Sequence, residues 1–206
     1  RRGYYVLDFL DPEGIQAFTG ALRNSRHREI YGLVNNAGIC DTQSLWSGEG
    51  TFMDVWKRVL RVNLEGPVEL THVLLADNFF SIDGRIVNIA SQLGRVGRAE
   101  HSAYCASKFG LVGVTEAWSR ERAPHGMTVN AVCPGWIGTE KVLEDLERRA
   151  KAKNRDVSRE RAELEARLDQ RRFNTPQEVA NIVAFLLSPE ASGITGQAIG
   201  MSGPMF

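Results

Sequence analysis

Short apolar runs alternate with longer amphipathic segments along nearly all of the 206 residues. The apolar runs predict strands over residues 3–9, 30–38, 84–91, 126–135 and 193–203. The amphipathic segments predict helices over residues 11–26, 51–80, 100–122 and 176–188, with two more inside 139–172. Alternation of this kind is typical of βαβ units, in which helices cover both faces of a parallel sheet. The sequence therefore predicts an α/β fold whose ligands bind outside the carboxyl ends of the strands.

Local signals place some helix ends and one bend. Asp11 followed by Pro12 predicts a first helix that is capped at Asp11 and has Pro12 in its first position. Gly66-Pro67 lies inside segment 51–80 and predicts a bend there. Thr175-Pro176 predicts the start of the last helix.

Length and charge limit the class of protein. A chain of 206 residues with 43 % hydrophobic and 24 % charged residues suits one domain over residues 1–206. Its 25 Lys and Arg residues balance 25 Asp and Glu residues, which argues against a nucleic-acid binder. No apolar run approaches the roughly 20 residues that cross a bilayer, and no signal-peptide pattern occurs. We therefore expect a cytoplasmic protein that does not bind membranes.

Three cysteines, Cys40, Cys105 and Cys133, are far apart and form no C-x-x-C pair. This spacing argues against disulfides and against a bound metal, and it indicates a reducing compartment. Cys105 and Cys133 are expected to be buried as small apolar side chains.

The stretch 139–172 is the one outlier in charge density. Two interpretations stay open at this point. The stretch is either a pair of solvated helices or a helical flap over a substrate site just before it.

Tyr104 and Lys108 form the most informative polar pair in the chain. They are four residues apart in a segment predicted to be helical, so their side chains share one face. The residues around them are small: Ser102, Ala103, Ala106, Ser107 and Gly110. That face is therefore open to a large flat group, and a phenol beside an ammonium suggests proton transfer. A simple packed helix is the other interpretation.

Four short motifs follow one another near the predicted strand ends. They are N-N-A-G over 35–38, Ser91 thirteen residues before Tyr104, Y-x-x-x-K over 104–108, and P-G-x-I-x-T over 134–139. In this combination, from about residue 4 to residue 203, the sequence resembles the short-chain dehydrogenase/reductase family. The resemblance implies a Rossmann-type doubly wound sheet and hydride transfer between a nicotinamide cofactor and a carbonyl or alcohol carbon.

The resemblance also implies four catalytic residues. Tyr104 would be the acid/base, and we expect the charges of Lys108 and the oxidised cofactor to lower its pKa from an ordinary value near 10. Lys108 would hold the nicotinamide ribose as well, and Ser91 would orient the substrate oxygen. Asn63 resembles the asparagine that kinks a helix and anchors a water, through which Lys108 exchanges protons with solvent. A local bond from Asn63 to backbone is the alternative.

The residues for the adenosine half of the cofactor follow from the same resemblance. Asp8 and the backbone of Phe9 would meet the adenine, unless Asp8 is only a turn residue. Asn36, Ala37 and Gly38 would pass under the ribose, where small side chains permit close approach of the backbone.

At the nicotinamide end, the resemblance implies contacts from Pro134, Gly135, Ile137 and Thr139. The substrate pocket is expected to include Gln92, Leu93 and Trp136, although Trp136 could equally be a core residue. His101 is expected either to touch substrate or to lie on the surface. Asn35 is expected to tie neighbouring strands together.

One departure from the family pattern is large. The family begins with a strand, a glycine-rich G-x-x-x-G-x-G turn and a helix, which together bind the pyrophosphate. These 206 residues contain no such motif. Two explanations are open. We expect that the segment precedes Arg1 in the source polypeptide, because strand 30–38 would otherwise have an unpaired edge. The alternative is that the chain is truncated and binds dinucleotides poorly. Because that segment selects the cofactor, the expectation is NAD or NADP.

The leading hypothesis is an oxidoreductase that interconverts a ketone and a secondary alcohol. Its motifs resemble most the 3-oxoacyl-thioester (acyl-carrier-protein) reductases, with sugar, polyol or hydroxy-acid dehydrogenases as alternatives. A non-catalytic dinucleotide-binding regulatory protein and a bare scaffold are further hypotheses. The resemblance also implies a homotetramer formed through segments 51–80 and 100–122.

Overall fold

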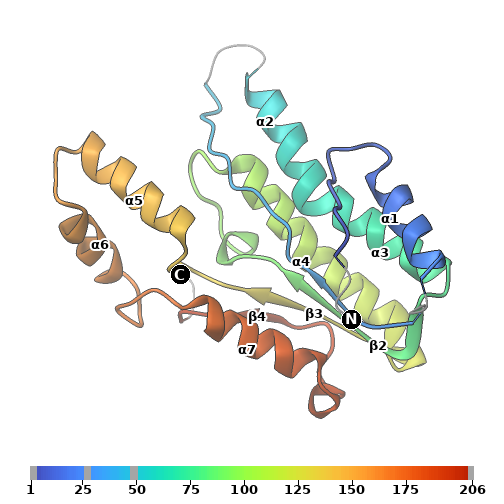
Figure 1. Ribbon diagram of the computed structural model, residues 1–206. Helices are drawn as coiled ribbons and strands as arrows, with labels where there is room; N and C mark the ends of the chain where they lie inside the picture. The colour runs from blue at the N-terminus through green and yellow to red at the C-terminus, as the bar shows by residue number, and fades with distance from the viewer. Residues whose placement is uncertain (1–3, 26–28, 47–50, 204–206) are drawn as a thin grey trace.

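The sheet consists of four parallel strands. In the computed structural model, which describes residues 4–25, 29–46 and 51–203, they are β1 (Ile30–Asn35), β2 (Phe80–Ile89), β3 (Thr128–Cys133) and β4 (Ala198–Gly200). Their order is β1-β2-β3-β4, so each strand lies beside the next one in sequence (Figure 1). All three pairings are parallel, which confirms the predicted α/β architecture.

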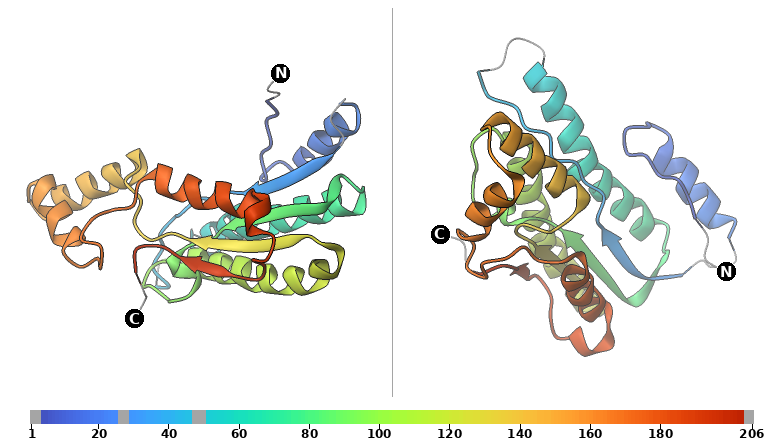
Figure 2. Two further views of the ribbon diagram at one scale, coloured as in Figure 1. Left: turned by 90° about the horizontal axis from the view of Figure 1, so that it is seen from below. Right: turned by 60° about the vertical axis from the view of Figure 1, so that its left-hand side comes forward.

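Helices cover both faces of this sheet. α4 (Ser102–Arg122) packs on one face together with α2 (Thr51–Leu60) and α3 (Gly66–Ala76), and α7 (Pro176–Leu187) lies on the other (Figure 2). α1 (Gly14–Arg23) packs along α3 beside β1. Three short 3-10 helices complete the connections at Gln92–Gly94, Ala123–His125 and Pro189–Ala191.

The central strands are buried on both faces, which explains their continuous apolar sequence. Successive residues of β2 point to opposite sides: Ile86 joins the cluster with Val129, whereas Val87 packs with Val132 under Leu186 of α7. All five side chains have an exposed fraction of 0 %. The interior of the sheet is therefore a two-sided hydrophobic core.

The N-terminal segment differs from its prediction. The predicted strand 3–9 is wrong for the residues that are described, because residues 4–8 have no regular structure and Val6 is 97 % exposed. A strand needs a hydrogen-bonding neighbour, and no described strand pairs with this segment. Residue 3 lies outside the described residues.

The first helix is shorter than predicted. It begins at Gly14 rather than at Asp11, and Glu13 occupies the N-cap position without a side-chain cap. Asp11 instead forms a turn, in which its Oδ1 accepts a hydrogen bond from the Glu13 N–H. Pro12 belongs to the same turn, and α1 ends at Arg23.

The long helix predicted over 51–80 is divided by a π-helical turn at Arg61–Glu65. The Gly66 N–H donates to the carbonyl of Arg61, five residues earlier, and α3 continues from there. Pro67 has no N–H, so it cannot donate to the carbonyl of Asn63 four residues earlier. The bend thus lies one turn before Gly66-Pro67, and Phe80 already belongs to β2 rather than to the helix.

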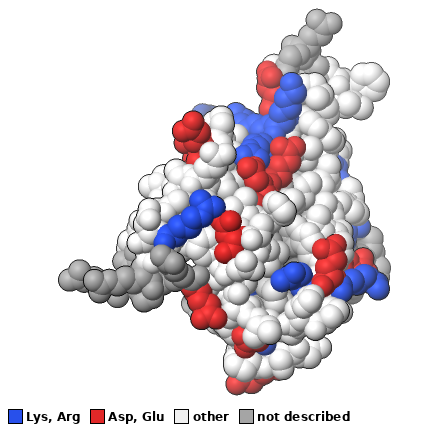
Figure 3. Space-filling view, turned by 90° about the vertical axis from the view of Figure 1, so that its right-hand side faces the viewer, with Lys and Arg blue, Asp and Glu red and all other residues white. Residues whose placement is uncertain are grey.

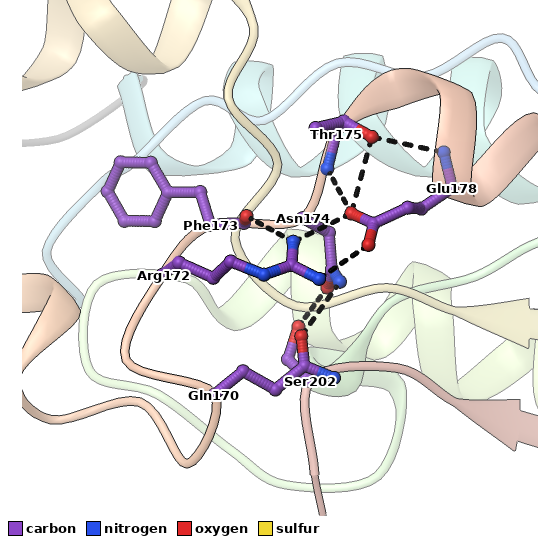
Figure 4. A network of polar contacts seen from close by, with 7 residues as sticks. All are labelled: Gln170, Arg172, Phe173, Asn174, Thr175, Glu178 and Ser202. Carbon is purple, nitrogen blue, oxygen red and sulfur yellow. Dashed lines mark hydrogen bonds and ion pairs between the residues drawn. The ribbon is translucent and has the colours of Figure 1, made fainter.

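The charged stretch folds into two helices as predicted, α5 (Glu140–Ala152) and α6 (Val157–Glu165), which extend beyond the sheet (Figures 1 and 2). Its two ends lie side by side, because Gly138 N–H donates to Asn174 O and Asn174 N–H donates to Trp136 O. Arg172 forms a two-pronged ion pair with Glu178, which also completes the capping box of Thr175 at the start of α7 (Figure 4). The stretch is therefore attached to the body of the molecule through a polar network.

No helix among the described residues is both long and apolar enough to span a bilayer. On the α1 side of the molecule, acidic side chains lie beside basic ones, in agreement with a formal net charge of zero (Figure 3). Cys40, Cys105 and Cys133 are free thiols, and the last two are buried as expected.

Candidate active site

The candidate site lies at the carboxyl ends of β1, β2 and β3. Asn35, the last residue of β1, donates from Nδ2 to Asn88 Oδ1 of β2 at 2.8 Å and to Thr71 Oγ1 of α3 at 3.2 Å. Asn35 therefore ties neighbouring elements together, as predicted. The exposed backbone of residues 36–38 continues from this anchored strand end.

Tyr104, Lys108 and Ser91 converge above the end of β2. Lys108 is only 3 % exposed, and its Nζ donates to the carbonyl of Ile89 at 2.8 Å. The same Nζ lies 5.6 Å from the centroid of the Tyr104 ring. Ser91 lines the same cleft as Tyr104 and is near enough to act on the pKa of its phenol, and the Ser91 Oγ accepts from the Leu93 N–H at 3.1 Å. The structure thus brings the three predicted residues together, and the interpretation of α4 as a merely packed helix is disfavoured.

Asn63 links the π-helical turn to this cluster. Its Nδ2 donates to the carbonyl of Ile39 and its Oδ1 accepts from the Ile39 N–H, both at 2.8 Å. Nδ2 also lies 3.2 Å from Ser107 Oγ, one residue before Lys108. A Cβ atom added to Gly38 would lie 3.4 Å from both Asn63 Oδ1 and Lys108 Nζ. The backbone of Gly38 thus passes directly beside the Asn63 amide and the Lys108 ammonium.

The electrostatics of the pair differ from the prediction. Burial raises the pKa of Tyr104 to about 12, and the hydrogen bond from Ser91 opposes that rise. Burial also lowers the pKa of Lys108 to about 8. The expected lowering of the Tyr104 pKa by Lys108 is therefore wrong for these side chains alone, because loss of hydration disfavours the phenolate and the ammonium alike.

The loop after β3 lies against the loop after β2. Gln92 N–H donates to Pro134 O at 2.9 Å, and a Cβ atom on Gly135 would meet Gln92 Oε1 at 2.8 Å. Ile137 forms an isolated bridge with Asn174, and Thr139 is the N-cap residue of α5. Pro134 and Gly135 therefore lie against Gln92 beside the Tyr104 cluster, whereas Ile137 and Thr139 lead from there into α5, and the nicotinamide role of all four stays a prediction.

Asp8 and Phe9 make different contacts. The Phe9 ring occupies the space where Gly66 would carry a Cβ atom, and the Phe9 carbonyl accepts from Arg61 Nε at 2.8 Å. Asp8 is exposed, and its Oδ1 accepts from the Leu10 N–H at 2.9 Å. Asp8 is thus a turn residue here, and its role at the adenine stays a prediction.

A cleft of about 1190 Å³ adjoins the cluster and extends under α5. Ser91 and Tyr104 line it together with the four residues predicted to shape the pocket, which are Gln92, Leu93, His101 and Trp136. Sequence reasoning missed three other lining residues, Cys40, Arg98 and Lys141. Cys40 follows the N-N-A-G motif by two positions, so its place beyond the end of β1 could have been inferred. Arg98 and Lys141 carried no such signal.

Comparison with known proteins agrees with this geometry. The family described as Enoyl-(Acyl carrier protein) reductase matches residues 1–203. The chain is 34 % identical over 206 residues to a 3-oxoacyl-[acyl-carrier-protein] reductase of Vibrio cholerae, covering 98 % of this chain and 76 % of that protein. It is 40 % identical over 174 residues to the acetoacetyl-CoA reductase of Shinella zoogloeoides, covering 84 % of this chain and 67 % of the relative.

A solved structure of an actinorhodin polyketide ketoreductase variant with NADPH has a TM-score of 0.85 and 33 % sequence identity, covering 97 % of this chain and 76 % of that one. The chain belongs to the short-chain dehydrogenase/reductase family, as the sequence motifs predicted.

Proposed function

We propose that the protein is a nicotinamide-dependent ketoreductase that interconverts a 3-oxoacyl thioester and the corresponding secondary alcohol. The observation that carries this proposal is the convergence of Tyr104, Ser91 and Lys108 at one end of a cleft. The relatives named for 3-oxoacyl and acetoacetyl substrates support the substrate class.

The residues of this chain account for the proton and for the position of the substrate. The Tyr104 hydroxyl holds the proton that is given to the carbonyl oxygen, and a pKa of about 12 keeps it protonated at neutral pH. We assign to the Ser91 hydroxyl, which lines the cleft beside Tyr104, the role of holding the same substrate oxygen. Lys108 adds a positive charge below the phenol ring, which stabilises the phenolate left after proton transfer.

Asn63 is proposed to support proton resupply. Its side-chain amide is held by two hydrogen bonds to the backbone of Ile39. Its backbone carbonyl receives no hydrogen bond from Pro67, because proline has no N–H. We assign to this backbone carbonyl the water that connects Lys108 with solvent.

The residues present fit the nicotinamide half of a dinucleotide. Gly38 and Gly135 both leave space that a side chain would fill, one beside Lys108 and the other beside Gln92. Lys108 would hold the ribose hydroxyls, and residues 134–139 would hold the carboxamide. When bound, the nicotinamide supplies or accepts the hydride. The proposed cofactor is therefore NAD or NADP.

We extend the proposal to α5 and α6, which we assign as a flap, since α5 supplies one wall of the cleft. We also propose a cytoplasmic homotetramer that associates through α2–α3 and α4. Met53 of α2 and Phe109 of α4 are 48 % and 45 % exposed, which supports an interface there. Light scattering of the purified protein tests the tetramer directly.

Turnover of ethyl 3-oxobutanoate with NADH and with NADPH tests the proposed activity. Reduction of the ester with either cofactor supports a ketoreductase. Cofactor binding without reduction of this ester or of 3-oxobutanoyl-CoA, and without oxidation of a polyol by the oxidised cofactor, would favour the non-catalytic regulatory protein instead.

A further inference from the structure

The cleft beside Tyr104 carries many charges. Six cationic side chains line it, Arg58, Arg98, Lys141, Arg148, Arg149 and Lys153, against four acidic ones, Asp41, Glu100, Asp145 and Glu144. Cations thus exceed acids by two along the wall. Which of these charges remain available to a ligand depends on the ion pairs that they form.

Most of the cations are already neutralised. Arg58 pairs with Asp41 at 2.7 Å. Arg148 and Arg149 share the carboxylate of Asp145, and Lys153 pairs with Glu160. Among the described residues, Arg98 and Lys141 are the two cations of the cleft that form no ion pair.

Arg98 is held in place by an aromatic side chain. Its guanidinium carbon lies 5.4 Å from the centroid of the Trp136 ring, and that of Arg149 lies 5.3 Å from the same centroid. Trp136 in turn stacks on Phe173, with ring centroids 6.0 Å apart. A guanidinium that lies on an aromatic ring keeps its N–H donors free at the edge, where they can bind a planar anion in two-pronged fashion.

The two free cations act at the side of the cleft nearest the reacting groups. Burial raises the pKa of the Cys40 thiol, the charges of Lys141 and Arg98 oppose that rise, and Asp41 and Asp145 add to it. Both of those carboxylates are already occupied by arginines. Among the described residues, Glu100 and Glu144 are the acids of the cleft without an ion pair, and both are exposed. Cys40 and Tyr104 line the same cleft.

We propose that Arg98 and Lys141 bind an anionic group of the substrate, a carboxylate or a phosphate, in the part of the cleft that adjoins Cys40. This inference rests on the proposed function, because it assumes that the ketone lies at Tyr104 and Ser91. It adds that the preferred ketone carries a negative charge, whose recognition is separate from the proton transfer.

Three substrates with the same reacting ketone test this proposal. Ethyl 3-oxobutanoate is neutral, 3-oxobutanoate carries a carboxylate, and 3-oxobutanoyl-CoA carries phosphates on a thioester. The variants are Arg98→Gln, Lys141→Gln and the double substitution. The quantity compared is the ratio of kcat/KM for a charged substrate to kcat/KM for the neutral ester. In the double variant, we expect this ratio to fall about tenfold, mainly because KM for the charged substrate rises. A fall for 3-oxobutanoate alone identifies a carboxylate site, and a fall for the CoA thioester alone identifies a phosphate site.

Arg120→Gln is the matched control, since Arg120 is 80 % exposed at its side chain and does not line the cleft. Like each of the single substitutions, Arg120→Gln removes one positive charge, and it is expected to leave the ratio unchanged. A ratio in the double variant within twofold of that of the unsubstituted protein, for both charged substrates, would overturn the proposal.

Calorimetric binding of 3-oxobutanoate and of CoA, without nicotinamide, separates this inference from the proposed function. If the unsubstituted protein reduces no ketone, the proposed function fails. Weaker binding of one of these anions by the double variant would still support the anion site. Equal binding by both proteins would refute it.

Discussion

The catalytic helix α4 and the helical stretch α5–α6 are held to the protein in opposite ways. On α4, Lys108 and Thr115 are 3 % and 1 % exposed, and both bond to β2, through Ile89 O and Asn88 Nδ2. On α6, Arg161–Glu165 and Arg159–Glu163 pair along the exposed helix surface. A change at Lys108 or Thr115 therefore disturbs buried polar bonds, whereas a change at the ion pair of Arg159 with Glu163 disturbs a contact that water can replace.

This difference indicates that proton transfer and the choice of substrate depend on different parts of the molecule. The groups assigned to proton transfer are fixed by the sheet, so their geometry does not depend on α5 and α6. Arg98 and Arg149 each lie over the Trp136 ring beside the cleft, and Trp136 stacks on the buried Phe173. Arg98 is exposed, so its substitution can change which ketone binds at little cost in stability.

The largest effect is expected from Tyr104→Phe, which removes the proton donor and keeps the ring. We expect kcat for ethyl 3-oxobutanoate to fall by about 10²- to 10⁴-fold, in the range of general acid catalysis, while cofactor affinity stays within a few fold. Steady-state kinetics and fluorescence titration with nicotinamide cofactor measure the two quantities. A loss of less than about threefold in kcat would remove Tyr104 from the acid/base role.

A large loss of stability is expected from Asn63→Ala. The substitution leaves the N–H and the carbonyl of Ile39 without their side-chain partner, and each unsatisfied buried group costs about 1–3 kcal/mol. Since two groups lose their partner, urea unfolding should show the free energy of unfolding reduced by about 2–5 kcal/mol in total. Unfolding midpoints that match the unsubstituted protein would show that this bond is not needed.

An intermediate effect is expected for Lys108, and it depends on pH. The pKa of Lys108 is about 8 in the folded protein, against an ordinary value of 10.5, so between these values the unfolded chain binds more protons. Stability should therefore rise with pH through this window, by up to about 3 kcal/mol, and the rise should be absent in Lys108→Met. Urea unfolding of both proteins between pH 7 and 10 measures this. Parallel stability curves would show that Lys108 is not titrating as a buried amine.

The smallest effect is expected from Arg161→Gln on α6. The pair with Glu165 spans 2.9 Å, but the Arg161 side chain is 49 % exposed, and such pairs contribute below about 1 kcal/mol. The stability of this variant should thus differ little from that of the unsubstituted protein. A loss as large as that of Asn63→Ala would mean that α6 is part of the core.

Much of the fold could be predicted from local pattern. Ile86 and Val87 lie in a continuous apolar run, and that run is a strand buried on both faces. The segment 3–9 has a similar pattern but forms no strand, because pairing depends on a neighbour that its own sequence does not reveal. The resemblance placed a helix kink at Asn63, which lies inside the π-helical turn, whereas the local pattern placed the bend at Gly66-Pro67, because the missing N–H of Pro67 affects a carbonyl four residues earlier.

The site was predictable where the motif residues share one helix or end neighbouring strands. Tyr104, Lys108 and Ser91 meet as expected from their positions. The direction of the Tyr104 pKa was not predictable, because it depends on burial that spacing does not reveal. Arg98, in the loop before α4, and Lys141, at the start of α5, line the same cleft, and their distance in sequence does not reveal this.

The most direct test is to follow the hydride to its carbon. Ethyl 3-oxobutanoate is incubated with nicotinamide cofactor deuterated at the transferring position, and the product is examined by NMR and mass spectrometry. The account predicts one deuterium at C3 of the 3-hydroxy ester with the unsubstituted protein and almost none with Tyr104→Phe. Product without deuterium, or equal yields of labelled alcohol from both proteins, would contradict it.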